Sequence, residues 1–172
     1  KLRETRALAG FTRILPPDGN LASPRLQPLK LDPLIDWLPA TKVYGEGIFL
    51  ELDAERIRQW LANGAAAARI APLAMHYNRV RTARLQPHRN VTAKFVLLHT
   101  LAHALINQLS FDCGYGSASL RERLYCDFTD SANPMQGILI YTASGDSEGT
   151  MGGLVRQAKP GRFEATLRRA MH

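Results

Sequence analysis

The clearest hydrophobic pattern in the chain is the stretch TAKFVLLHTLAHALINQLS near its middle. At about 100° per residue, its apolar side chains cover nearly the whole circumference of a helix, which is typical of a buried helix. One narrow polar line interrupts this surface, formed by His99, His103 and Asn107 at successive one-turn intervals. Because buried polar groups need partners, we expect this line to be sealed inside a compact core and held by internal hydrogen bonds. The pattern predicts a central buried helix over residues 91–110.

Two short apolar runs predict strands. GIFLEL at residues 47–52 is rich in β-forming residues, and GILIYT at residues 137–142 is a continuous apolar run typical of a buried strand. Asp53 follows the first run and is a suitable N-cap for a helix that continues to about Leu61. The pair Asn63-Gly64 then ends that helix.

Further elements complete the expected fold class. Residues 117–125 fit a strand and a helix equally well, and residues 154–158 and 162–171 have helical patterns. Strands therefore alternate with helices along the chain, which favours an α/β fold. We predict an α/β core over residues 47–172, with a mixed sheet packed on the central helix.

Proline sets the first part of the chain apart. Six of the ten prolines lie before residue 41. Proline removes a backbone donor and disfavours helix at the residue before it. Residues 1–46 are therefore predicted to form an extended, Pro-rich arm that lies on the core.

Positive charge is concentrated in two segments of the chain. Lys and Arg outnumber Asp and Glu by 22 to 15, which gives a net charge of +7. Residues 76–94 carry no acid, and residues 156–169 carry Glu164 alone. Such segments can bind the phosphates of DNA or an acidic partner, and the alternative is a solvated face. The candidate binding residues are Arg79, Arg81, Arg84, Arg89, Lys94, Arg156, Lys159, Arg162, Arg168 and Arg169.

The two histidines of the central helix raise the possibility of a metal site. Residues i and i+4 lie about 5–6 Å apart on one helix face, so His99 and His103 can share a zinc ion. The spacing matches the H-E-x-x-H helix of metalloproteases, but Thr100 occupies the place of the catalytic carboxylate. A third ligand has three candidates, Asp146, Glu148 and Glu122. We favour hydrogen-bonded core histidines and keep a metal-dependent hydrolase as the alternative function.

Other features of the sequence exclude several classes of protein. Cys113 and Cys126 are too few for a disulfide framework or a four-cysteine zinc site, so we expect reduced thiols in a cytoplasmic protein. The glycine-rich loop at residues 143–153 has neither a G-K-[ST] nor a G-x-G-x-x-G sequence, so it does not predict a nucleotide site. No apolar run is long enough to span a membrane. The first residues of this sequence lack the pattern of a signal peptide, but the sequence starts at Lys1 rather than Met, which leaves a removed leader open.

Three blocks of the sequence together resemble a known family. They are KLRETRALAGFTRI, LLHTLAHALINQLSFDCGYGSASLRERLY and GILIYTASGDSEGTMGGLV, in this order. They resemble the C-terminal region of DrmB-type proteins of the DISARM phage-defence system, and the related domain at the end of MrfA-type helicases. The resemblance implies a non-catalytic DNA-handling and scaffold subunit that partners a SNF2-like helicase, DrmA.

The resemblance also implies zinc, but not at any residue of this chain. In the family, the cysteine cluster that binds zinc normally follows the GGLV helix, and no such cluster is present up to His172. We therefore expect no cofactor within these residues and place zinc in a cysteine-rich continuation.

Overall fold

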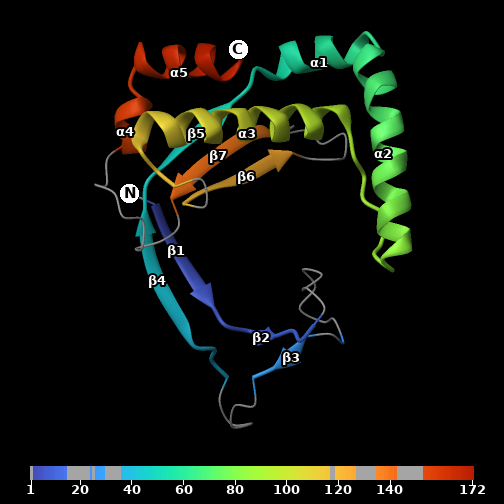
Figure 1. Cartoon of the computed structure of the whole chain (residues 1–172), viewed down its shortest axis with the longest axis vertical. Coiled ribbons are helices and arrows are strands. Elements are labelled where there is room, and N and C mark those ends of the chain that lie inside the picture. Colours follow the sequence, from blue (N-terminus) through green and yellow to red (C-terminus); the bar gives the residue numbers. More distant parts are fainter. Residues whose placement is uncertain are drawn as a thin grey trace. The chain divides into compact units, whose positions relative to one another are not determined.

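The protein was analysed as a computed structural model, which describes residues 2–14, 24, 26–29, 36–116, 119–126, 135–142 and 153–172. The chain divides into two compact units, one of residues 3–43 and a larger one that contains residues 44–172. The described residues form five helices and small antiparallel sheets (Figure 1), so the predicted α/β class is confirmed. None of the described helices combines the length and the apolar character that crossing a membrane requires.

The smaller unit contains most of the residues of four short strands. Strand β1 (Leu2–Ala7) pairs with β4 (Ala40–Gly45), and β2 (Gly10–Phe11) pairs antiparallel with β3 (Gln27–Pro28). The proline content predicted extended backbone here, and the described strands are extended. Their pairing with one another was not predicted, and the expectation of an arm that lies on the core stays a prediction.

The core of the larger unit contains a three-stranded sheet with the order β5-β7-β6. Strands β5 (Gly47–Glu51) and β6 (Leu120–Cys126) both run antiparallel to the central strand β7 (Gln136–Thr142). Both predicted strands are confirmed, but the prediction of a mixed sheet is wrong for this part of the chain. For β6 and β7 the reason is the length of their connection, because residues 127–135 are too few for the crossover that parallel pairing needs.

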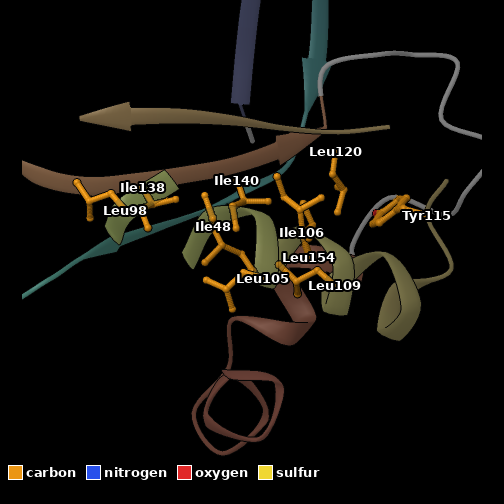
Figure 2. Packing of buried hydrophobic residues seen from close by; sticks show 11 residues of the cluster. Ile48, Leu98, Leu105, Ile106, Leu109, Tyr115, Leu120, Ile138, Ile140 and Leu154 are labelled. Carbon is orange, nitrogen blue, oxygen red and sulfur yellow. The ribbon is translucent and has the colours of Figure 1, made fainter. Parts of the chain in front are cut away.

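Helix α3 (Ala93–Cys113) packs one face on this sheet. Thr92 caps its start by accepting a hydrogen bond from the Phe95 backbone N–H over 3.1 Å, and Gly114 ends it at a φ of +72°. Leucines of α3 meet isoleucines of β7 in a fully buried layer (Figure 2). That layer consists of Leu98, Leu105, Leu109, Ile138 and Ile140. The predicted central helix is therefore confirmed, and it continues three residues past Ser110.

A buried carboxylate fixes the start of α4 (Gly153–Gln157). Glu46 is only 5% exposed and follows β4 directly. Its carboxylate accepts hydrogen bonds from the Tyr115 hydroxyl and from the backbone N–H groups of Leu154 (3.1 Å) and Val155 (3.2 Å). The Tyr115 hydroxyl and both N–H groups therefore have an acceptor. Through these hydrogen bonds, Glu46 connects three segments that are distant in sequence.

A second carboxylate joins α5 (Arg162–Ala170) to α3. Asp112 accepts hydrogen bonds from Gln108 over 2.8 Å, from the Thr166 hydroxyl over 2.8 Å and from Arg169 over 2.6 Å. Burial raises the pKa of Asp112, but these three donors more than offset it, so the pKa lies below its usual value. The helical patterns predicted near residues 154–158 and 162–171 correspond to α4 and α5.

The remaining two helices lie between β5 and α3 in the sequence. Helix α1 (Ala54–Ala62) begins as predicted, because the Asp53 side chain accepts a hydrogen bond from the Arg56 N–H over 2.8 Å. Helix α2 (Ala65–Ala83) follows after Gly64, whose φ of +71° turns the chain sharply. Neither helix contains a buried residue. Helix α2 was not predicted from the sequence.

Candidate metal centre and adjoining groove

His99 and His103 lie one turn apart on α3 and point to the same place. Their Nε2 atoms are 3.0 Å apart, and their rings meet edge to face. Their side chains are 45% and 59% exposed, and Asn107 is exposed as well. The prediction that this polar line is sealed in the core is therefore wrong. Only one face of α3 packs on the sheet, and the polar line runs along the border of that face.

Glu122 of β6 completes this group, which we call the His–His–Glu cluster (His99, His103 and Glu122). Its Oε1 lies 3.1 Å from the His99 Nε2 and 3.7 Å from the His103 Nε2. Glu122 occupies this place because side chains alternate along a strand. Leu120 and Leu124, two positions away on either side, both pack into the core.

The sequence contained a signal for Glu122 that was only partly used. The alternation L-x-E-x-L places a carboxylate on the core-facing side of a strand, where an acid is unusual. Because residues 117–125 fitted a helix equally well, Glu122 was one of three candidate ligands. The other two, Asp146 and Glu148, lie outside the described residues.

The second oxygen of Glu122 is unpaired within the part of the chain that the structure describes. Its Oε2 is buried and has no hydrogen-bond partner among the described residues, although the side chain as a whole is 21% exposed. An unpaired buried acceptor is unfavourable unless something else compensates its charge. The unpaired carboxylate oxygen therefore makes the cluster suited to binding a cation.

A groove adjoins the cluster on one side. It has a volume of about 970 Å³ and lies between α2, the first turns of α3 and β6. Tyr77, Arg84, Arg89 and Phe95 line it, and His99 and Glu122 border it. A smaller hollow of about 590 Å³ lies beside His103 and Asn107, and Glu122 borders that hollow too. The cluster is thus accessible from two directions.

Arg89 is held firmly in this groove. Its guanidinium lies 4.9 Å from the centre of the Phe95 ring, and the Phe95 ring in turn stacks on His99 at 5.5 Å. Asn78 donates to the Arg89 carbonyl over 3.0 Å and accepts from the Arg89 N–H over 2.9 Å. Burial raises the pKa of Tyr77, but hydrogen bonds from Arg89 and Arg81 outweigh it, so that pKa lies below its usual value.

The other basic candidates have different surroundings. Arg81 donates to the Pro87 carbonyl over 2.6 Å, and Arg79 bonds to the His76 ring over 3.0 Å. Lys94 is at the first turn of α3. In the second segment, Arg169 pairs with Asp112, whereas Arg156 and Arg168 are exposed on α4 and α5. Lys159 is exposed between these helices, and Arg162 is exposed at the start of α5. The structure brings two candidates, Arg84 and Arg89, into one groove.

Both cysteines are half-buried, form no disulfide in the described part of the chain and lie outside the His–His–Glu cluster. Burial raises the pKa of the Cys113 thiol, and the carboxylates of Asp112 and Glu46 raise it further. A thiol with a raised pKa is a weak nucleophile and a weak metal ligand at neutral pH.

Comparisons with known proteins show what this chain is similar to. Residues 101–172 match the MrfA Zn-binding domain. Over 160 residues, or 90% of its length, the chain is 35% identical to the DISARM protein DrmB of Bacillus paralicheniformis. The chain is therefore a DrmB homologue with an MrfA Zn-binding domain at its C-terminus, as the resemblance implied. It spans 27% of the length of that relative.

The class suggests zinc, and the His–His–Glu cluster has a suitable set of ligand atoms. Two imidazole nitrogens and a carboxylate oxygen are ordinary zinc ligands. The matched segment contains His103 and Glu122, and His99 lies two residues before it. Across the described part of the chain, no other group of three or more His, Cys, Asp or Glu residues brings its ligand atoms together.

Proposed function

We propose that this chain is a non-catalytic DNA-handling and scaffold part of a DISARM phage-defence protein. It acts beside a SNF2-like helicase subunit, DrmA. The similarity to DrmB supports the phage-defence context. The groove that contains Arg84 and Arg89 supports the DNA-handling role, and it is the single observation on which that role rests.

The groove combines the two features that bind single-stranded nucleic acid. Cationic side chains attract the phosphates, and aromatic or guanidinium planes stack on unpaired bases. Arg89 is already fixed against Phe95, so binding costs it little side-chain entropy. Tyr77 is 39% exposed and lines the same groove, so a base can reach its ring. These features favour an unpaired strand over a double helix, whose bases are already stacked on one another.

A matched pair of double variants tests this proposal. Arg84→Ala/Arg89→Ala removes two positive charges from the groove, and Arg156→Ala/Arg168→Ala removes two from α4 and α5. Arg81 is left intact because its side chain holds the Pro87 carbonyl. Binding of a labelled single-stranded oligonucleotide is measured by fluorescence anisotropy at several salt concentrations.

We expect the groove variant to weaken binding about tenfold and to reduce the slope of log K against log salt by about 1.4. The control variant should weaken binding less than about threefold. Equal losses in the two variants would show that affinity follows net charge, which would contradict the proposal that DNA binds in the groove. Intact DNA binding with loss of helicase association in the groove variant would assign the groove to the protein partner instead.

A metal-dependent hydrolase is the alternative, because the His–His–Glu cluster borders the same groove. The same oligonucleotide, incubated with zinc and the wild-type chain, separates the two functions. An intact strand supports the non-catalytic role. Cleavage that disappears in His99→Ala would overturn it.

A further inference from the structure

We propose that His99, His103 and Glu122 bind one zinc ion within this chain itself. The ligand atoms are the Nε2 atoms of both histidines and the Oε1 of Glu122. The fourth position is open to solvent and takes a water molecule. This site uses no thiol, so it is independent of any cysteine cluster and of whether the groove binds DNA.

The distances between the three ligand atoms fit a tetrahedral ion. With metal–ligand bonds of about 2.0–2.1 Å, the ligand atoms of a tetrahedral zinc site lie about 3.4 Å from one another. Here the separations are 3.0 Å between the histidines, 3.1 Å from His99 to Glu122 and 3.7 Å from His103 to Glu122. One ion above this triangle can therefore reach all three atoms with small side-chain adjustments.

The ligands are positioned by the fold rather than by one another. Two of them share a helix face, and the third comes from a strand of the sheet on which that helix packs. The His99 ring is also stacked on Phe95, with 5.5 Å between the ring centres. Ligands held on rigid elements require little reorganisation when the metal binds.

The charge of the cluster also favours a cation. The carboxylate of Glu122 is mostly buried, and its Oε2 has no hydrogen-bond donor in the described part of the chain. The two nearest groups are imidazoles, whose neutral forms can give only one N–H each. A divalent ion uses the lone pairs of all three groups and compensates the buried negative charge.

The exposure of the cluster indicates which type of zinc site it is. Structural zinc sites are closed by four protein ligands, whereas sites with three protein ligands keep one position for water. The histidine side chains are 45% and 59% exposed, and hollows lie on both sides of the cluster. The site is therefore of the open type, and the ion has a direct route of entry.

Zinc titration of the metal-stripped chain tests this proposal. A chromophoric chelator reports the affinity, and elemental analysis after dialysis reports the stoichiometry. We expect one zinc per wild-type chain and less than about one tenth of that in His99→Ala/His103→Ala. The isosteric variant Glu122→Gln should weaken zinc binding at least about tenfold, because it removes the charge of a ligand.

The chain supplies its own control, because His76 and His88 form a second exposed pair of histidines. His76→Ala/His88→Ala removes the same number of imidazoles and should retain full zinc binding. Equal loss in both histidine variants would show unspecific surface binding and overturn the proposal. Zinc that survives His99→Ala/His103→Ala but is lost in Cys113→Ser/Cys126→Ser would assign the metal to the thiols. Failure of the wild-type chain to bind zinc would also overturn it.

A spectroscopic measurement on the wild-type chain does not depend on any variant folding. Cobalt(II) in place of zinc should give the visible absorption bands of a tetrahedral site with nitrogen and oxygen ligands. Strong near-ultraviolet bands from thiolate-to-cobalt charge transfer would contradict the assignment.

Discussion

Two carboxylates of the larger unit, Glu46 and Glu122, have opposite surroundings. Glu46 is 5% exposed, and its oxygens accept hydrogen bonds from the Tyr115 hydroxyl and two backbone N–H groups of α4. Glu122 is 21% exposed and has two histidine nitrogens near one oxygen, whereas its second oxygen has no donor among the described residues. Both side chains come from strands or strand ends beside the same helix, so their difference arises from the donors around them.

The difference separates a structural role from a binding role. A buried polar network with every member satisfied specifies one packing and stabilises it. A carboxylate that has one unpaired oxygen and lies beside two imidazoles does less for stability and is available to a ligand. We therefore expect Glu46 to matter mainly for folding and the His–His–Glu cluster mainly for metal binding.

The largest expected effect is on stability. Glu46→Ala leaves the Tyr115 hydroxyl and two N–H groups of α4 without an acceptor, and it should lower the free energy of unfolding by about 3 kcal/mol. Urea denaturation followed by circular dichroism measures this change. Glu51→Ala, which removes an exposed carboxylate from β5, should change stability by less than about 0.5 kcal/mol. Similar values for the two variants would refute the structural role of Glu46.

A smaller effect is expected at the carboxylate that joins α5 to α3. Asp112→Asn weakens the hydrogen bonds from Thr166 and Arg169, so it should lower the free energy of unfolding by about 1–2 kcal/mol at pH 7. Arg169→Ala should lower it by less than about 1 kcal/mol, because that guanidinium is 52% exposed.

The pH dependence of this effect has a definite sign. The pKa of Asp112 lies below its usual value in the folded protein, because three hydrogen-bond donors outweigh the effect of burial. Its ionised form therefore stabilises the fold at pH values above the unfolded pKa of about 3.9, and this contribution is lost as the pH falls through the lower folded pKa. The stability difference between wild type and Asp112→Asn should accordingly shrink in acid. A difference that stays constant down to pH 2 would exclude this linkage.

The smallest effect on folding is expected in the cluster itself. In the presence of a chelator, His103→Ala should change the free energy of unfolding by less than about 0.5 kcal/mol, because its side chain is 59% exposed. In zinc-containing buffer, the wild-type chain should gain stability and the variant should not. A loss above about 1.5 kcal/mol in chelator would restore the view of His103 as a core residue.

Local patterns predicted most elements of the larger unit. The N-cap at Asp53, the strand β7 and the helix α3 each depend on interactions between residues close in sequence. These elements are therefore confirmed nearly as predicted. Helix α2 was missed, because Pro72 and a basic, acid-free segment lie within it and none of its residues is buried. Strand β6 could not be distinguished from a helix in the sequence. Residues 117–125 are too short a segment to separate the strand period of 2 residues from the helix period of 3.6 residues.

By itself, the sequence determined the similarity to DrmB, the net charge and the one-turn spacing of His99 and His103, because these depend on residue identity and local geometry alone. Tertiary structure alone decided that the histidines are exposed, because the orientation of α3 on the sheet selects which face is buried. It also decided that Glu122 lies beside them, since β6 belongs to the sheet on which α3 packs. Contacts between residues distant in sequence depend on how the elements pack, and no local pattern contains that information.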